Sequence, residues 1–291
     1  MQTIEHTMAL YLAMDGDMDK VKRYLPAFLL PDAIRMYTGL REYSHFEMSP
    51  DKMDVSYMKF PSDMKSMTRE SVQALLQTDS HITEHGKCAI GEDTNAYMFE
   101  KYNKHLPEDM YRGIYLHLVQ DSLFDTFVRE KIDCTKRYDD EFVLADGAKV
   151  DGAGVRKSIA NMESFMSYAL AEKCYTKYGI TPNQEWFDKN IRPVIEEAYP
   201  ADLAENTYKY MKFTPEASEA IKNHAWQGLK VEGVGLASYS KILSEVVDTT
   251  RNTFNSPWHY EWHYDMQKGD IPEPVATDYA ETDHDREDGF V

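Results

Sequence analysis

Apolar residues recur every three or four positions along most of the chain, the spacing that places them on one face of an α-helix. The clearest case is residues 107–132, where Pro107 suits the first turn and an apolar stripe includes Ile114, Leu118 and Val128. Further helices are predicted over residues 4–14, 68–78, 95–104, 155–178, 182–197, 202–212, 215–227 and 239–252. The first is apolar nearly all round and should be buried, and the second is capped by Thr68, with Ser71 in place of the usual acid of a capping box. We therefore expect a chain that is mainly helical.

Two prolines interrupt this pattern near the N-terminus. Asp17 is a good N-cap for a short helix that runs to about Tyr24, and Pro26 then ends it. Pro31 suits the first turn of a helix because its φ angle is already helical and no N–H is needed there. A new helix is therefore predicted to begin at Asp32.

Strand character is limited to two segments. Residues 142–152 contain Asp146-Gly147, a dipeptide typical of a two-residue β-hairpin turn, and residues 53–65 have weak strand or loop character. The pattern as a whole predicts an all-α (mainly), multi-helix single domain with one or two small β-hairpins. This domain is expected over residues 1–266, followed by an acidic C-terminal tail over residues 267–291.

The charge of the chain excludes some classes of partner. A formal net charge of -18 argues against a nonspecific coat for DNA or RNA, because such binding depends on Lys and Arg. Duplex nucleic acid is therefore not expected as a partner, and a small-molecule substrate is. GxGxxG, Walker A, GxSxG and CxxC patterns do not occur, which removes the commonest nucleotide, serine-hydrolase and thiol-redox classes.

Location and oligomeric state are less constrained. The sequence begins without the basic and apolar segments of a signal peptide, and it has no run of about 18 apolar residues. Three widely spaced cysteines do not form a disulfide framework. A cytoplasmic protein without a membrane span is expected, and the oligomeric state stays open.

The strongest local signal for chemistry is His117-Leu-Val-Gln-Asp121 within the helix predicted over 107–132. Residues four apart lie one turn apart on the same helix face, and the other members of this face are apolar. His117 and Asp121 should therefore point into the protein. A buried carboxylate needs a partner, which is either a metal ion or a structural His–Asp hydrogen bond.

Four further residues are candidates for the same site. Asp32 follows an apolar run and is either a metal ligand or an ordinary helix-start residue. His6 in the first helix and His45 in an aromatic loop are ligands or packed rings. Arg35, one turn beyond Asp32, would pair with that carboxylate or grip a substrate phosphate.

Taken together, these residues indicate a metal centre. The predicted ligands are His6, Asp32, His45, His117 and Asp121. Three imidazoles and two carboxylates suit a divalent metal, zinc first and manganese or iron as alternatives. Asp32 or Asp121 would bridge metals or orient a water, and Arg35 would contact substrate. Since five ligands exceed the need of one tetrahedral zinc, two metals could bind, as in many phosphoester hydrolases.

The chain also resembles a known group of proteins. An early His in the opening helix, then "LLPDA", "SHF" and "GIYLHLVQDSLFD", look like the bacterial zinc-dependent phospholipase C-like group, whose relatives include the S1/P1-type nucleases. The resemblance covers roughly residues 4–128. It implies an all-α metal hydrolase and metal-binding roles for the matching His and Asp residues, and hence a metal-dependent phosphoesterase.

Other interpretations stay open. The HD phosphohydrolases are a rival resemblance, but their His-Asp doublet occurs here only at His284-Asp285. His81 and His85 are candidates for a metal or substrate contact, and the aromatic segment with His259 and His263 for a ligand-binding wall. The chain could also be a helical binding or regulatory protein with structural His–Asp pairs, or a non-haem iron oxygenase with two His and one carboxylate.

Overall fold

The computed structural model describes residues 3–49, 54–79, 92–131, 141–143, 149–151, 167, 169–211 and 236–255. Most of these residues are helical, so the predicted mainly α-helical fold is confirmed. The labelled helices are α1 (Thr3–Ala13), α2 (Met18–Thr38), α3 (Arg41–His45), α4 (Arg69–Gln73), α6 (Glu92–Asn103), α7 (Glu108–Lys131), α9 (Gln184–Asn190), α10 (Arg192–Ala198), α11 (Ala201–Lys209) and α13 (Leu236–Asn255). Residues 169–178 are helical as well.

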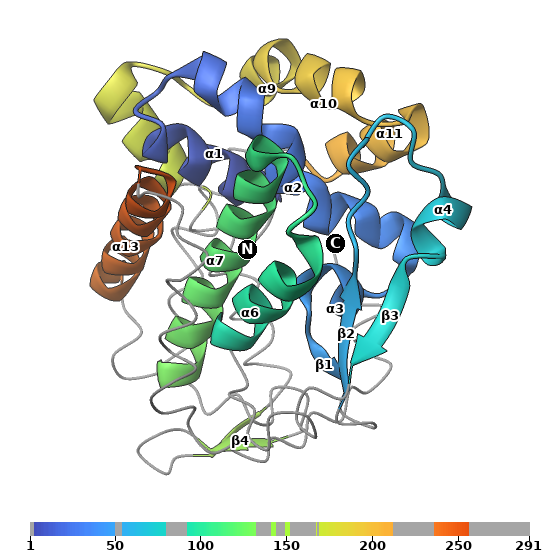
Figure 1. Cartoon of the computed structure of the whole chain (residues 1–291). Coiled ribbons are helices and arrows are strands. Elements are labelled where there is room, and N and C mark those ends of the chain that lie inside the picture. The colour runs from blue at the N-terminus through green and yellow to red at the C-terminus, as the bar shows by residue number, and fades with distance from the viewer. Residues whose placement is uncertain are drawn as a thin grey trace.

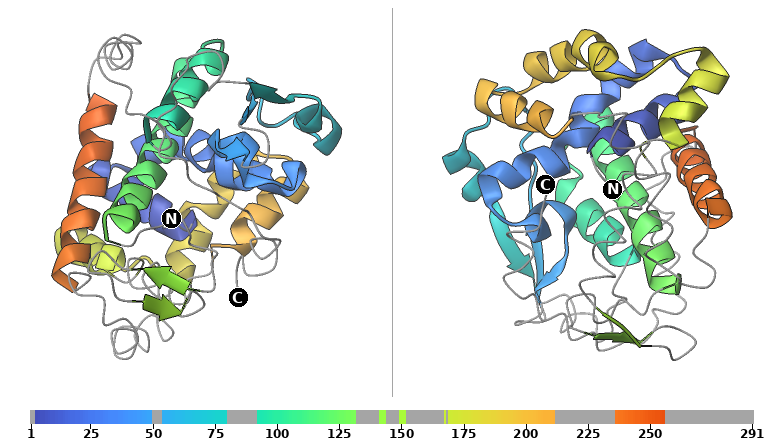
Figure 2. Two further views of the ribbon diagram at one scale, coloured as in Figure 1. Left: turned by 90° about the horizontal axis from the view of Figure 1, so that it is seen from below. Right: turned by 180° about the vertical axis from the view of Figure 1, so that it is seen from behind.

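Helix α2 lies at the centre of this arrangement. Helix α7 packs along it, and α1, α3, α4, α10 and α11 contact it from other sides. Helix α13 lies against α1 and α7, and α6 lies against α7 (Figure 1). The two further views show α13 and the α9–α11 group on separate sides of the α2–α7 pair (Figure 2). The α2–α7 contact is thus the framework on which the other helices are placed.

The prolines do not divide α2, so the prediction of two helices over this segment is wrong. Helix α2 starts at its Asp17 N-cap, continues through Pro26 and Pro31, and ends where Gly39 adopts a left-handed conformation. A proline inside a helix removes one backbone hydrogen bond and costs about 3 kcal/mol. Twelve buried residues of α2 supply the opposing free energy. Tyr199 of the α10–α11 corner also donates a hydrogen bond to the Pro26 carbonyl oxygen, at 2.5 Å.

Two other helix predictions are corrected. Thr68 caps α4 through the expected Thr68–Ser71 capping box, but α4 ends at Gln73, and Leu76–Asp79 form strand β3. The helix predicted over 182–197 is split at Ile191 into α9 and α10. Pro193 explains the split, since it lacks an N–H and suits only the first turn of a helix.

The strands are short and antiparallel. Strands β1 (Met48–Ser49), β2 (Asp54–Met58) and β3 (Leu76–Asp79) form a sheet in the order β1-β2-β3, beside α6. Strands β4 (Glu141–Val143) and β5 (Lys149–Asp151) pair in antiparallel fashion, which confirms a hairpin in this segment, and the predicted Asp146-Gly147 turn lies outside the described residues. The three-stranded sheet exceeds the one or two hairpins expected, because β3 was assigned to a helix.

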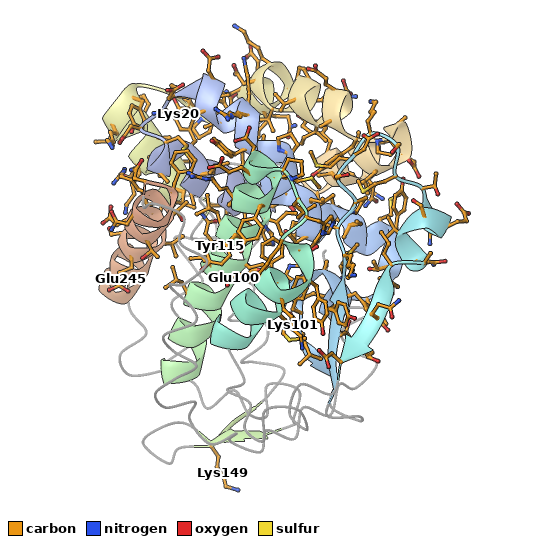
Figure 3. All side chains as sticks on the ribbon, viewed as in Figure 1. Lys20, Glu100, Lys101, Tyr115, Lys149 and Glu245 are labelled. Atoms are coloured by element: carbon orange, nitrogen blue, oxygen red, sulfur yellow. The ribbon has the colours of Figure 1, made fainter. Side chains whose placement is uncertain are left out.

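Buried aromatic and aliphatic side chains form one continuous core around α2 and α7. Glu100 and Tyr115 are buried where α6 and α7 meet (Figure 3). None of the helices in the described ranges is both long enough and apolar enough to cross a lipid bilayer. The predicted tail over 267–291, the helix over 215–227 and residues 155–166 of the helix predicted over 155–178 lie outside the described residues.

Candidate metal centre

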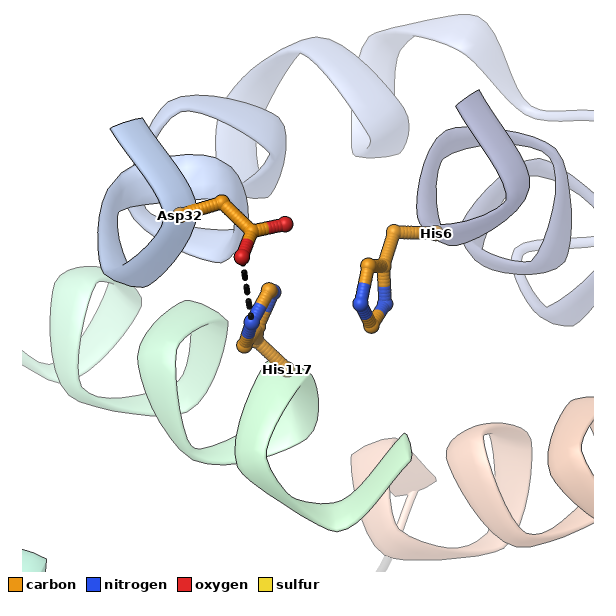
Figure 4. Close-up of side chains that lie close together, drawn as sticks. All are labelled: His6, Asp32 and His117. Atoms are coloured by element: carbon orange, nitrogen blue, oxygen red, sulfur yellow. Dashed lines mark ion pairs between the residues drawn. The ribbon is translucent and has the colours of Figure 1, made fainter. Parts of the chain in front are cut away.

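Five side chains from four helices meet at one buried point. His6 comes from α1, Asp32 from α2, His45 from the last turn of α3, and His117 and Asp121 from α7. The ring centroid of His117 lies 4.1 Å from that of His6 and 5.3 Å from that of His45. Figure 4 shows His6, Asp32 and His117 pointing toward one another from three helices. The structure therefore brings together all the residues that the sequence nominated as ligands.

The close crossing of α2 and α7 makes this meeting possible. Gly113 lies on α7 one turn before His117, and a Cβ atom there would lie 2.7 Å from Ala27 Cβ and 2.9 Å from Phe28 N. Only a glycine allows the two backbones to approach so closely. Helix α1 is buried on all sides, which carries His6 into the interior opposite this crossing.

Three of the ligand atoms, from His45, His117 and Asp121, have the mutual spacing of a metal coordination shell, and a carboxylate oxygen of Asp32 lies beside the two imidazoles. His45 Nε2 lies 3.2 Å from His117 Nε2. Asp121 Oδ2 lies 3.4 Å from each of these nitrogens, and Asp32 Oδ1 lies 3.6 Å from the first and 3.9 Å from the second. Ligands about 2.0–2.1 Å from a tetrahedral zinc would lie about 3.3 Å from one another. The three separations among His45, His117 and Asp121 are therefore close to those of one tetrahedral site, and Asp32 Oδ1 lies somewhat farther from the two nitrogens.

A hydrogen-bond chain sets the tautomer of His6. Thr250 donates to the Val246 carbonyl oxygen at 2.6 Å, so its hydroxyl oxygen accepts from Gln120 Nε2 at 2.9 Å. The oxygen of the Gln120 amide then faces His6 Nδ1 at 2.8 Å, and Nδ1 must carry the proton. Buried His6 Nε2 makes no hydrogen bond to the residues that the structure describes, yet it lies 3.1 Å from Asp121 Oδ1. A lone pair facing a carboxylate at this distance favours a cation between or beside them.

Backbone contacts orient His45 in the same way. Its Nδ1 lies 3.2 Å from the Arg41 carbonyl oxygen, which can only accept, and 2.9 Å from Ser44 Oγ. Nδ1 is therefore the donor, and Nε2 faces the other ligand atoms. Histidines that bind metals in proteins are commonly held by such a bond from the second ring nitrogen.

His117 is the most enclosed of the three imidazoles. Its side chain is fully buried, and its Nδ1 makes no hydrogen bond to the described residues. Burial, with the neighbouring His6 as a smaller cause, lowers the pKa of His117 to about 4. The ring is therefore neutral near pH 7, the form that can donate a lone pair to a metal.

Charged neighbours keep both carboxyl groups ionised. Burial acts to raise the pKa of Asp32, but the surrounding imidazoles, His117 first, hold it well below its usual range. Burial is likewise outweighed at Asp121, whose pKa lies well below the usual value with Arg41 among the positive charges that lower it. Burial and Arg41 lower the pKa of His45, but its interactions with Asp121 and Asp32 together raise the pKa by more, so the net shift is upward. A cation entering this site would therefore compete with a proton on His45.

The setting of some predicted site residues differs from the prediction. Asp32 lies in the interior of α2 and not in a first turn, because α2 continues through both prolines. It has no exposed helix-start N–H groups to cap, so that explanation of the residue is removed. His45 lies on helix α3 and not in a loop.

Arginine 41, and not Arg35, contacts the acidic ligands. Within the described part of the chain, Arg35 forms no ion pair with Asp32. Arg41 Nη1 instead lies 3.7 Å from Asp32 Oδ1, and Nη2 donates to Asp121 Oδ2 at 2.7 Å. The pairing proposed for Arg35 is therefore wrong, whereas a contact of Arg35 with substrate stays a prediction.

Sequence reasoning missed Arg41 and Gln120. Gln120 directly precedes Asp121, and its place on the buried part of α7 was a usable signal for a buried polar partner. Arg41 had no signal of its own, because its contacts depend on how α3 sits against α7. The described residues hold a second three-residue group that could bind a metal, formed by His6, Asp32 and His117, which shares members with the first. His81, His85, His259 and His263 lie outside the described residues.

Comparison with protein-family models, with curated proteins and with solved structures found no match to this chain.

Proposed function

We propose that this chain is a metal-dependent hydrolase that acts on a phosphoester through a metal-activated water. The observation that carries the proposal is the close set of His45 Nε2, His117 Nε2 and Asp121 Oδ2, with Asp32 Oδ1 beside the two imidazoles. His6 adds a further electron-rich atom to the site, because its Nε2 has no hydrogen-bond partner among the described residues and faces Asp121. A divalent cation such as zinc, or manganese or iron, held by these residues would lower the pKa of a coordinated water and supply the nucleophile.

The charge of the cluster supports a divalent cation more than a structural role. Two ionised carboxylates, Asp32 and Asp121, are balanced by Arg41, but Arg41 is shared with Glu47 at 2.8 Å. A neutral His117 contributes no positive charge, and even with a proton on His45 the three carboxylates of Asp32, Asp121 and Glu47 exceed the positive charges of Arg41 and His45 by one. Buried carboxylates without full compensation are strongly unfavourable, and a divalent ion would supply the balance.

Two features favour a phosphoester of modest size as the substrate. The guanidinium of Arg41 lies at the edge of the ligand set, and guanidinium groups match phosphate oxygens in geometry and charge. The net charge of -18 disfavours long polyanions, so a small phosphorylated molecule is the better fit. The resemblance of residues 4–128 to zinc-dependent phospholipase C-like proteins agrees with this class.

The test measures metal before activity. The full chain is freed of metal with a chelator, titrated with Zn²⁺ and Mn²⁺ by calorimetry, and assayed on bis-p-nitrophenyl phosphate and p-nitrophenyl phosphate. We expect metal binding, a metal-dependent rise in Tm and hydrolysis, all lost in His117→Ala. His105→Ala is the matched control, because His105 is exposed and contacts only the Phe60 carbonyl among the described residues. A wild-type protein that binds neither metal would refute the proposal.

An oxygenase is a second candidate with a specific observation behind it. His45, His117 and Asp121 alone have the composition of the two-histidine, one-carboxylate sites that hold non-haem iron. Asp32 as a fourth ligand favours hydrolysis, since oxygenases keep several iron positions open. Iron as the metal of the purified protein, with oxygen consumption in place of phosphoester hydrolysis, would favour the oxygenase.

A further inference from the structure

Within the described residues, the candidate metal centre is exposed to solvent at one edge. The side chains of His6, His45 and His117 are at most 1% exposed and that of Asp121 is 6% exposed. Those of Asp32 and Arg41 are 20% and 28% exposed. In the part of the chain that the structure describes, the solvent-exposed edge of the centre is therefore formed by Arg41 and Asp32, and this edge is its entrance.

Arg41 is held at this entrance with its charge directed inward. Glu47 Oε1 accepts a hydrogen bond from Arg41 Nε at 2.8 Å, which fixes the outer edge of the guanidinium. The two terminal nitrogens face the carboxylates of Asp121, at 2.7 Å, and Asp32, at 3.7 Å. The backbone carbonyl of Arg41 also orients His45, so the residue is anchored at both ends.

The carboxylate oxygens that Arg41 contacts are the same two that lie near the Nε2 atoms of His45 and His117. These atoms are Asp121 Oδ2 and Asp32 Oδ1. A divalent cation bound there would draw on the same lone pairs and weaken their hold on the guanidinium. Arg41 would then be a fixed positive group beside the cation, on the side from which substrate arrives.

We infer that Arg41 is the substrate-binding residue that contacts the phosphate oxyanion, and that in the free protein it serves as counter-charge for Asp32 and Asp121. This inference rests on the proposed hydrolase function and assigns to Arg41 the substrate contact first considered for Arg35. Planar, bidentate donation to phosphate oxygens is the property that distinguishes arginine from lysine at such a position. A counter-charge that competes with the cation has an additional consequence: its removal should not weaken metal binding.

The experiment separates metal affinity from phosphate affinity. Full-length wild type, Arg41→Ala, Arg41→Lys and Arg35→Ala are titrated first with Zn²⁺ and then, in the zinc-loaded form, with inorganic phosphate. Arg23→Ala is the matched control, because Arg23 is an exposed arginine of α2 that also pairs with an aspartate of α7, Asp109. Far-ultraviolet circular dichroism and Tm confirm that each variant is folded.

We expect Arg41→Ala to bind zinc at least as tightly as wild type and phosphate about 10- to 100-fold more weakly, the effect of losing a charge-assisted hydrogen bond. Arg41→Lys should regain part of the phosphate affinity, while Arg35→Ala and Arg23→Ala should match wild type. A folded Arg41→Ala or Arg41→Lys protein with wild-type phosphate affinity overturns the inference, and so does a loss confined to Arg35→Ala. Zinc-loaded wild type that does not bind phosphate also overturns it, whereas failure of zinc binding itself refutes the proposed function.

Discussion

Replacing Gly113 by alanine tests whether the α2–α7 crossing positions the candidate metal centre. The added Cβ would lie 2.7 Å from Ala27 Cβ, 2.9 Å from Phe28 N and 2.9 Å from Tyr24 O. Two of these neighbours are backbone atoms, which cannot rotate away. Since ordinary contacts begin at 3.4 Å, the two helices must separate by about 0.5–0.7 Å.

The magnitude follows from two opposing effects. Overpacking of a close-packed interior costs about 1–3 kcal/mol. Alanine in a helix gains about 1 kcal/mol over glycine. We therefore expect Gly113→Ala to lower the free energy of unfolding by up to about 2 kcal/mol. The separation also moves Asp32 away from His117, and metal sites hold their ligand distances within about 0.2 Å, so zinc affinity should fall about tenfold or more.

Urea denaturation and zinc calorimetry of wild type and Gly113→Ala measure both effects. Gly179→Ala is the control: Gly179 has φ +66°, but no atom lies within 4 Å of an added Cβ. It should lose about 1 kcal/mol through backbone strain and keep its zinc affinity. If Gly113→Ala is as stable as wild type and binds zinc equally well, the close crossing does not set the ligand geometry.

Three further changes test other parts of the structure. Gln120→Leu leaves His6 Nδ1 without its hydrogen-bond acceptor. We expect the free energy of unfolding, measured by urea denaturation, to fall by about 1–3 kcal/mol and the zinc affinity, measured by calorimetry, to fall about 10- to 100-fold. Unchanged zinc affinity would contradict the assigned tautomer. Burial raises the pKa of Glu100 from 4.5 to about 7, so its folded form holds the proton more tightly and stability is lost as pH rises from about 4.5 to above 7. The free energy of unfolding of Glu100→Gln minus that of wild type, measured by urea denaturation, should be up to about 3 kcal/mol more favourable at pH 8 than at pH 4.5. The same difference at both pH values would exclude the pKa shift. Asn103→Ala removes the side chain that accepts from Phe60 N and donates to Met58 O. The loss of these two bonds should lower the free energy of unfolding, measured by thermal or urea unfolding, by about 2–4 kcal/mol. No measurable change would mean that the two backbone groups find other partners.

Local spacing in the sequence was sufficient for some features because the physics behind them is local. His117 and Asp121 are four residues apart on one helix, so they share a face wherever that helix lies. The Thr68–Ser71 capping box and the hairpin around Asp146-Gly147 likewise depend only on neighbouring residues. The apolar sequence of residues 4–14 was enough to predict a buried α1, and with it a buried His6.

Only the tertiary structure decided how these local features combine. Pro26 and Pro31 have a strong local tendency to end a helix, yet burial of the surrounding residues keeps α2 continuous. That continuity moves Asp32 from a helix start into a helix interior facing α7. The contacts of Arg41 with Asp32 and Asp121 depend in the same way on the packing of α3. Spacing along a chain determines which side chains share a helix face, but side chains on different helices meet only where burial of their apolar faces brings those helices together, and no local pattern encodes that distance.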